Sequence, residues 1–338
     1  MTAGPVFDHL SRLTTPTGLF EHARLTTPRV EHGYCLDDVA RALVVTSRER
    51  EPSSVVQRLQ RDYLRFTLLA QDDRGRFHNR RRADGVWTDQ PGVGDHWGRA
   101  VWALGTVVAT TADPTLAEVA AEAALRALGR RSPWWHATAY AALGAAELLT
   151  VHRTDQVALD HLGEARAALA DQTSGAAWPW PDARLTYANA VLPEALIAIG
   201  VALEDAAMLR RGLDLLRWLV DLQTTGNHLS PVPVGGWAPG EPLPAFDQQP
   251  IEVTALAEAC ARALAATGDA TWSRALGRCV AWFAGANDLG RPLYDATTGG
   301  GYDGLQRDRV NANQGAESTL AALATIQLAL HTDLRVAA

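Results

Sequence analysis

Small and apolar residues recur at helical spacing along the whole chain. Six stretches have wide apolar faces, residues 39–45, 100–108, 137–149, 195–203, 253–264 and 320–330. Six amphipathic stretches lie ahead of them, residues 6–13, 55–70, 116–128, 162–170, 213–222 and 272–285. We expect each amphipathic stretch to pair with the apolar helix that follows it, giving six αα-hairpins. The pattern predicts an all-α fold, an (α/α)6 toroid of helical hairpins with long loops at one end, as a single domain over residues 1–338.

The links expected inside these pairs are often long. Residues 77–94, 226–249 and 293–314 each exceed the length that compact domains usually leave irregular, and each leads into the start of an apolar helix. We therefore expect them to form the rim of a cavity, with strand signals confined to short pieces around Phe77 and Leu293. The loops carry aromatic residues that could stack on sugar rings or simply hold the loops in place, namely Trp87, Trp237, Tyr294 and Tyr302.

Polar or acidic groups stand at the start of each apolar helix. Taken singly, an acid in a first helical turn is explained by capping and by the helix dipole, and Pro193 and Pro250 place Glu194 and Glu252 in such turns. In a toroid, however, six parallel inner helices would bring all these starts to one end. The predicted cavity therefore gathers several carboxylates, which raise one another's pKa.

Carboxylates held close together suit glycoside hydrolysis by an acid and a base. An inverting enzyme separates the two by roughly 6.5 to 9.5 Å, which a toroid cavity can accommodate. The candidate catalytic residues are Asp38, Asp95, Glu194, Glu252 and Glu317. Arg41 and Arg99 follow Asp37 and Asp95 by four residues, and such pairs would lower the pKa of those two acids. This spacing favours Asp38 over Asp37 as the participating acid.

Hydrogen-bonding groups at the same helix starts suit sugar hydroxyls. The candidate substrate-binding residues are His32, Tyr34, Arg41, His96, Trp97, Arg99, His136, Asn189, Gln249, Tyr302, Asp303, Asn313 and Gln314. No histidine or cysteine pair has the spacing of a metal-binding motif, so we expect neither a metal nor another cofactor.

Composition excludes several classes of function. The 338 residues include no lysine, so Schiff-base, pyridoxal-phosphate and Walker-type P-loop chemistry are excluded. A net charge of −7 opposes non-specific nucleic-acid binding, and the run Arg80-Arg81-Arg82 is expected to be a solvated loop. Three scattered cysteines indicate reduced thiols. With no signal sequence and no apolar run long enough to span a membrane, we expect a cytoplasmic protein.

Two motifs resemble a known group of proteins. The stretches HGYCLDDVARA, residues 32–42, and NQGAESTL, residues 313–320, are similar to motifs of bacterial (α/α)6 proteins that accompany, or are fused to, glycosyltransferases. The resemblance spans most of the chain. It implies a six-hairpin toroid, a link to oligosaccharide metabolism and a glycosyltransferase partner, but it assigns no catalytic pair. A wider similarity is to six-hairpin glycosidases and to the N-acylglucosamine 2-epimerase type of toroid.

These observations predict a carbohydrate-active enzyme, an inverting glycoside hydrolase acting on an oligosaccharide. Two alternatives stay open: a sugar 2-epimerase or isomerase in which His96 and His136 move protons, and a non-catalytic glycan-binding partner of a glycosyltransferase. Cavity carboxylates that are all neutralised by arginines would favour the second alternative. Nucleotide-sugar transfer by this chain is not expected, because neither an alternating strand–helix pattern nor a glycine-rich phosphate turn is present. Motifs alone do not distinguish a carbohydrate-active toroid from a toroid that works like a terpene cyclase.

Overall fold

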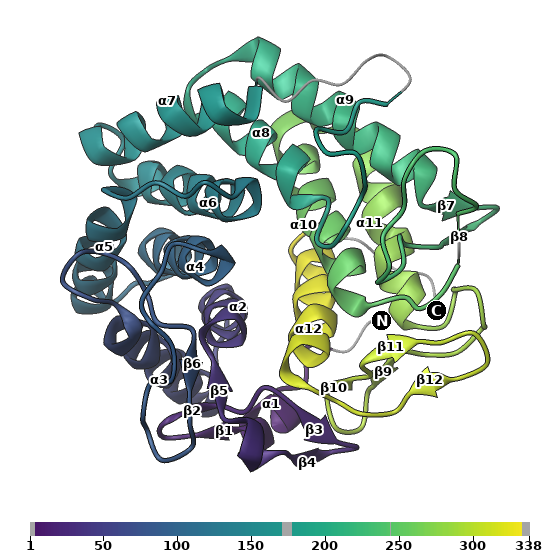
Figure 1. Cartoon of the computed structure of the whole chain (residues 1–338), viewed down its shortest axis with the longest axis horizontal. Coiled ribbons are helices and arrows are strands. Elements are labelled where there is room, and N and C mark those ends of the chain that lie inside the picture. Colours follow the sequence, from purple (N-terminus) through teal and green to yellow (C-terminus); the bar gives the residue numbers. More distant parts are fainter. Residues whose placement is uncertain (1–3, 171–177, 244, 333–338) are drawn as a thin grey trace.

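The helices form two concentric rings in the computed structural model, which describes residues 4–170, 178–243 and 245–332. Six inner helices surround the centre of the molecule and six others lie outside them (Figure 1). The inner helices are α2 (Leu36–Ser47), α4 (Asp95–Thr110), α6 (Trp135–Val151), α8 (Val191–Ala202), α10 (Pro250–Thr267) and α12 (Ala316–His331). The outer helices are α1 (Asp8–Leu13), α3 (Ser54–Ala70), α5 (Pro114–Leu128), α7 (Gln156–Ala170), α9 (Ala206–Leu222) and α11 (Ala270–Phe283). Every predicted helix is present, and the predicted (α/α)6 toroid is confirmed.

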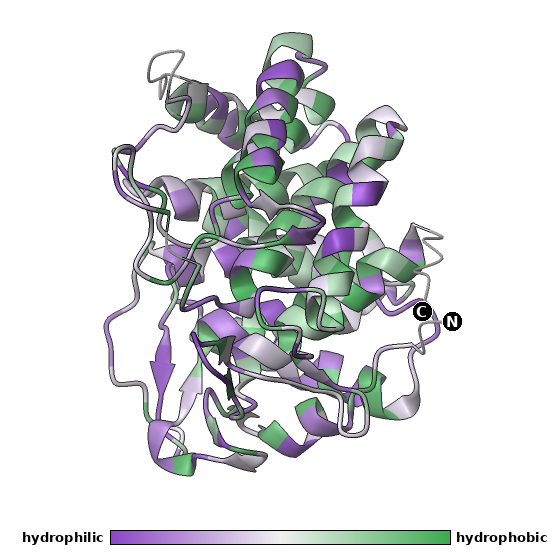
Figure 2. Cartoon of the chain, turned by 90° about the vertical axis from the view of Figure 1, so that its right-hand side faces the viewer, coloured by the Kyte–Doolittle hydropathy of each residue, from purple (hydrophilic) through white to green (hydrophobic). Residues whose placement is uncertain are grey.

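The burial of each helix follows from its place in the rings. Inner helices touch neighbours on every side, so α10 is buried without a break from Pro250 to Cys260 and α12 from Ser318 to Ala329. Outer helices bury one face only, as in α9, where buried positions recur at helical spacing. Figure 2 shows the apolar residues along the helices and more hydrophilic ones in the loops. None of the helices among the described residues has the length and hydropathy needed to span a bilayer.

The hairpins are grouped differently from the sequence-based expectation. Most inner helices pack more extensively on the outer helix that follows than on the one that precedes. The connections inside these inner-to-outer hairpins are short, residues 48–53, 111–113, 152–155, 203–205 and 268–269. The longest links instead join an outer helix to the next inner helix. The predicted order within a pair was therefore wrong, while the placement of the long loops at the starts of the inner helices was right.

The ring is closed by the two ends of the chain. The last inner helix, α12, packs against α2 and also against α1 from the N-terminal end. Short two-residue strands pair within the loops at the cavity end. They are β1 (Thr14–Thr15) with β2 (Gly18–Leu19), β3 (Ala23–Arg24) with β4 (Thr27–Pro28), β5 (Tyr34–Cys35) with β6 (Arg80–Arg81), β7 (Thr224–Thr225) with β8 (His228–Leu229), β9 (Tyr294–Asp295) with β10 (Gly300–Gly301) and β11 (Gly304–Leu305) with β12 (Val310–Asn311). The strands in residues 14–35 and 224–229 were not predicted.

Candidate functional site

A polar cavity of about 730 Å³ lies at the N-terminal ends of the inner helices. Residues from α2, α4 and α12 and from the long loops surround it. Its lining contains six carboxyl side chains and three guanidinium groups, from Glu21, Asp37, Asp38, Asp95, Asp303 and Glu317 and from Arg41, Arg80 and Arg99. The remaining lining residues are His22, Cys35, Asn79, His96, Tyr187, Gln249, Ile251, Asn311, Gly315 and Ser318.

Two of the carboxyl groups share the guanidinium of Arg41. Its Nη1 donates to Asp38 Oδ1 at 2.6 Å and its Nη2 lies 2.9 Å from Glu317 Oε2. The Asp38 side chain is only 5% exposed, whereas that of Glu317 is 40% exposed. Burial raises the pKa of Asp38 to about 7 despite the opposing charge of Arg41, and the neighbouring Glu317 and Glu21 carboxylates add to the rise. Asp38 therefore retains a proton at neutral pH in a substantial fraction of molecules.

A second pair of carboxyl groups surrounds Arg99. This guanidinium donates from Nη1 to Asp37 Oδ1 at 2.6 Å, lies 3.9 Å from Asp95 Oδ2, and sits 4.6 Å from the centre of the Tyr140 ring. Burial alone would raise the pKa of Asp37, but the charges of Arg99 and Arg41 outweigh it and hold the pKa at about 2. The Tyr187 hydroxyl donates to Asp95.

One of the two predicted ion pairs is present among the described residues, that of Arg99 with Asp95 at 3.9 Å. Arg99 lies closer to Asp37, at 2.6 Å, and Arg41 binds Asp38 on its own helix rather than Asp37. The Arg99–Asp37 and Arg41–Glu317 pairs join neighbouring inner helices. Of Asp37 and Asp38 it is Asp38 that has the raised pKa, as expected, because it is the more deeply buried and has further carboxylates beside it.

Local capping does not explain the acids at the helix starts. None of the six inner helices has a side-chain hydrogen bond from its own N-cap residue. Outer helices are capped in the usual way, for example by Asp113 at α5 and Asp205 at α9. The inner helix starts instead receive groups from elsewhere in the chain: Asn79 accepts from the Asp37 amide at 3.2 Å, and Asp303 from the Gly315 amide at 2.8 Å.

Glu252 serves such a structural purpose and does not line the cavity. Its carboxyl group accepts from the Ala188 amide and, at 3.0 Å, from the Asn189 side chain, just ahead of α8. Burial raises its pKa to about 7, against the hydrogen bonds that it accepts from Asn189 and Ala188. Glu252 and Asn189 therefore bond to each other in the protein interior, and neither lines the cavity.

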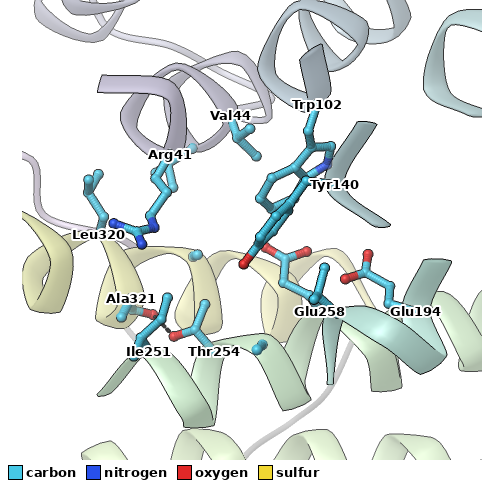
Figure 3. Close-up of a pocket in the computed structure, with 14 residues that line it drawn as sticks. Arg41, Val44, Trp102, Tyr140, Glu194, Ile251, Thr254, Glu258, Leu320 and Ala321 are labelled. Carbon is cyan, nitrogen blue, oxygen red and sulfur yellow. Dashed lines mark hydrogen bonds between the residues drawn. The ribbon is translucent and has the colours of Figure 1, made fainter. Parts of the chain in front are cut away.

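Glu194 lies below the cavity in a small chamber of about 40 Å³. Figure 3 shows its carboxyl group near that of Glu258, beneath the Trp102 and Tyr140 rings, with Arg41 at the opposite side of the chamber. Arg262 donates from Nε to Glu194 Oε1 at 3.0 Å. Burial raises the pKa of Glu194 to about 7. Arg41 and Ile251 line both spaces, so the chamber adjoins the cavity where the other acids meet.

Of the predicted substrate-binding residues, some line the cavity and others do not. Those in the lining are Arg41, His96, Arg99, Gln249 and Asp303. Those outside it are His32, Tyr34, Trp97, His136, Asn189, Tyr302, Asn313 and Gln314. His96 is held by its Nε2, which donates to the Phe77 carbonyl at 3.0 Å. Burial raises the pKa of Asp303.

The excluded polar residues have partners elsewhere. The Tyr34 hydroxyl is within 2.8 Å of both Thr15 and Thr17, and Gln314 accepts from the Thr298 hydroxyl. His136 donates to the Tyr187 carbonyl at 2.9 Å. Asn313 accepts from the Leu25 amide in a separate groove. The hydrogen bonds of these groups connect loop segments within the protein.

Three of the excluded residues are aromatic rings held by packing. Trp97 is completely buried, and Tyr302 packs on the apolar core. His32 packs edge-on against His22 outside the cavity.

The aromatic residues of the long loops also serve packing. Trp87 stacks on His78 and contacts Phe66, and the Trp237 indole donates to the Glu241 carbonyl. None of Trp87, Trp237, Tyr294 and Tyr302 lines the cavity. The cavity is lined by the phenol ring of Tyr187, which was not predicted, and by the imidazole rings of His22 and His96.

Four other unpredicted lining residues come from segments without a helical pattern. Glu21 and His22 lie in the N-terminal loops, and Asn79 and Arg80 follow Phe77. Arg80 pairs with Glu21 and lines the cavity, while its side chain stays 48% exposed, as expected for the arginine run. The pairing of β5 with β6, which aligns Cys35 with Arg80, positions it. No sequence signal identified that pairing.

One group of potential metal ligands occurs among the described residues. Oxygen and sulfur atoms of Glu21, Cys35 and Asp38 lie within 4.8 Å of one another. Arg80 and Arg41 bind the two carboxylates, and burial raises the pKa of the Cys35 thiol well above its usual value. Two guanidinium groups beside these atoms repel a cation and the thiol keeps its proton, so these residues do not fit a resident metal.

Searches of protein-family models and of curated protein sequences find no match to this chain. Solved structures do match. Cellobiose 2-epimerase from Spirochaeta thermophila superposes with a TM-score of 0.68 at 14% identity, covering 98% of this chain and 95% of that one. A D-mannose isomerase gives 0.64 at 10% identity, covering 96% and 95%. The cellulase Cel9M of C. cellulolyticum in complex with cellobiose gives 0.63 at 9% identity, covering 94% and 88%.

The chain shares the (α/α)6 toroid fold of these proteins. At such low identity the likeness concerns the fold alone. An association with glycosyltransferases finds no support in these comparisons.

Proposed function

We propose that the protein is a carbohydrate-active enzyme, an inverting glycoside hydrolase that cleaves a neutral oligosaccharide in the polar cavity. The observation that carries this proposal is the presence in one cavity of a buried carboxyl group with a raised pKa, Asp38, and a second carboxyl group, Asp95, on a different helix and beside a different arginine. Carboxyl groups in such different surroundings are suited to acid and base roles.

Asp38 is the proposed general acid. A carboxyl group that holds its proton near neutral pH can donate it to the oxygen of the departing sugar, where an ordinary carboxylate could not. Arg41 cannot neutralise both Asp38 and Glu317, and the charge left over supports retention of a proton on this pair.

Asp95 is the proposed general base. It lies on α4, away from Arg41, and its Oδ2 accepts from Tyr187. This leaves Oδ1 available to take a proton from an attacking water. The proposed acid and base then lie on different helices and beside different arginines. An inverting enzyme needs its two carboxyl groups apart, with room for a water molecule between the base and the sugar. Glu317, the most exposed carboxylate of the two arginine-bound pairs, is the rival base.

The charge of the cavity favours a neutral substrate. Six carboxyl groups outnumber three arginines, so anionic sugars and nucleotide sugars would be repelled. Fold similarity to a cellobiose 2-epimerase, a D-mannose isomerase and a cellulase in complex with cellobiose supports a sugar substrate.

The test is hydrolysis of defined oligosaccharides by the purified chain. Asp38→Asn should lower kcat by about 10²- to 10⁴-fold, the range of general acid–base catalysis, without altering the circular dichroism spectrum. Asp84→Asn is the matched control, because Asp84 is an exposed carboxylate that pairs with Arg82 on a loop. Full activity of Asp38→Asn would refute the role assigned to it.

Two further measurements separate the candidate bases and the stereochemistry. Proton NMR of the first product should show inversion at the anomeric carbon, and retention would contradict the mechanism. Azide should restore activity to Asp95→Ala and yield a glycosyl azide of inverted configuration. Rescue of Glu317→Ala instead would transfer the base role to Glu317.

Epimerisation or isomerisation of a free sugar is the second candidate, and the geometry of His96 favours it. Because the Phe77 carbonyl can only accept, Nε2 of His96 carries the hydrogen and Nδ1 is the basic atom. His136, the other predicted proton carrier, lies outside the cavity behind Tyr187. Conversion of free disaccharides or mannose without bond cleavage, abolished in His96→Ala, would establish this activity in place of hydrolysis. Saturable glycan binding without turnover would instead favour a binding protein.

A further inference from the structure

A stack of three aromatic rings backs one wall of the cavity. Trp135 and His136 have ring centres 3.5 Å apart at an interplanar angle of 22°, and His136 and Tyr187 have centres 4.4 Å apart at 6°. The Trp135 indole donates to Asp182 Oδ2 at 2.7 Å. Trp135 and His136 begin α6, and Tyr187 belongs to the loop ahead of α8. Tyr187 is the ring of the stack that lines the cavity.

Tyr187 is fixed in place although it is 41% exposed. Its hydroxyl donates to Asp95, its carbonyl accepts from His136, and its ring packs on the His136 ring. The His136 ring covers one face of the Tyr187 ring, so the exposed area of Tyr187 lies on its other parts. An aromatic ring that is rigid before a ligand arrives loses little conformational freedom on binding.

A second ring at the same end of the toroid is still more exposed. Trp134 is the N-cap residue of α6, directly before Trp135, and is 64% exposed. Its amide donates to Ser132 and its carbonyl accepts from Thr138, so its backbone is fixed while its indole is open to solvent. As the residue that precedes an inner helix, Trp134 offers a flat apolar surface at the same end of the toroid as the cavity.

The chemistry of these rings beside the charged cavity fits a sugar chain. Sugar rings present C–H groups on their faces and hydroxyls at their edges, so a flat aromatic ring can cover a face while carboxylates and arginines bind the edges. We propose that Tyr187 and Trp134 form an aromatic platform that binds successive sugar units beyond the one held between Asp38 and Asp95. The substrate is then an oligosaccharide of three or more units. This inference rests on the proposed carbohydrate function.

The test is the dependence of affinity on chain length. Asp38→Asn, which prevents cleavage, is titrated calorimetrically with cello- and manno-oligosaccharides of two to six units. Thio-linked analogues with the unaltered chain give a second measurement if Asp38→Asn is unstable. Affinity should increase with length. Trp134→Ala should weaken binding of the longer chains by about two- to tenfold and leave disaccharides unaffected.

Variants at Tyr187 separate the ring from its hydroxyl. Tyr187→Phe should keep the length dependence, whereas Tyr187→Ala should weaken binding at every length. Val201→Ala is the control, because Val201 is an exposed apolar residue at the opposite end of α8. Equal affinities for Trp134→Ala, Tyr187→Ala and the parent, or no length dependence, would overturn the platform.

The two proposals can fail separately. Length-dependent binding that requires Trp134, without cleavage by the unaltered chain, supports the platform and refutes the hydrolase. Cleavage at rates that do not change in Trp134→Ala and Tyr187→Ala supports the hydrolase and refutes the platform. The platform is also overturned if Asp38→Asn binds none of these oligosaccharides and the unaltered chain binds none of the thio-linked analogues.

Discussion

Each of two arginines in the cavity is bound by two carboxyl groups. Arg41 lies between Asp38 and Glu317, and Arg99 lies between Asp37 and Asp95. The arginines hold the carboxyl groups in position without neutralising all of them. This distinguishes the site from a fully paired network, in which no group would be left to exchange a proton.

Arg99 should be essential for stability as well as geometry. Arg99→Gln leaves the Asp37 carboxylate buried without its cation, and breaking a buried pair in this way costs about 3–5 kcal/mol. Urea denaturation followed by circular dichroism measures the change. Arg82→Gln, which removes an exposed arginine paired with Asp84, should change the unfolding free energy by less than about 1 kcal/mol. Similar losses in both variants would show that burial of Arg99 does not matter.

The protonation of Asp38 should limit activity at alkaline pH. With a pKa of about 7, Asp38 loses its proton as the pH rises through neutrality, so kcat should fall above about pH 7. A pH profile of kcat for the unaltered chain tests this. An alkaline limb two or more units higher would exclude Asp38 as the acid.

At the scale of residues, the sequence identified part of the site. Asp38, Asp95 and Glu317 could be found because each stands at a helix start and these starts converge. Glu194 and Glu252 stand at similar positions, yet Glu194 lines a separate small chamber and Glu252 binds backbone amides of the preceding repeat. That difference depends on how the loops fold back, which no helical pattern records.

Helix packing around the ring depends on close approach at glycines. In α4 and α6, a Cβ at Gly98 would overlap the Ala137 carbonyl oxygen, one at Gly105 that of Gly144, and one at Gly144 that of Val101. These backbones are in direct contact, so no side chain fits between them.

Gly105→Ala should therefore destabilise the protein, although alanine is the better helix former. Overpacking of this kind costs about 1–3 kcal/mol. Gly163→Ala in α7 is the matched control, since nothing lies near the added methyl, and it should stabilise by about 0.5–1 kcal/mol. Thermal unfolding of the two variants should shift the midpoint in opposite directions. A shift to higher temperature for Gly105→Ala would contradict the close packing.

At the scale of elements, periodicity predicted the twelve helices but not their grouping. The spacing of apolar residues shows which face of a helix is buried, for example in α2 or α9. It does not show which other helix covers that face. Whether α3 belongs with α2 or with α4 depends on loop length and packing. The short strands escaped prediction because two residues are too few to show an alternating pattern.

The whole molecule should become less stable between mildly acidic and neutral pH. The folded pKa values of Asp38 and Glu194, about 7, exceed the ordinary carboxyl value of about 4, so the folded state binds more protons in this interval. The unfolding free energy should therefore fall as the pH rises from about 4 to 7 and then level off.

Urea denaturation at pH 5 and pH 8 tests the sign. Glu194→Gln should reduce the difference between the two conditions, and Glu122→Gln, at an exposed carboxyl of α5, should not. Greater stability at pH 8 than at pH 5 would show that the buried acids are ionised without cost.

Closure of the ring suggests how the chain unfolds. Because α12 contacts both α1 and α2, no hairpin is terminal and each has two neighbours. We propose that residues 1–338 form a single cooperative domain. Tryptophan fluorescence and circular dichroism should then give coincident denaturation curves, and separate midpoints would indicate independent units.

The surplus of carboxyl groups over arginines also bears on competition among solutes. Sugar phosphates and nucleotide sugars carry the same hydroxyls as free oligosaccharides, so hydrogen bonding alone would admit them all. With six acids and three arginines around the entrance and walls, such anions meet a repulsive field before any hydroxyl is contacted. In a mixture rich in phosphorylated metabolites, the cavity would remain open to uncharged chains.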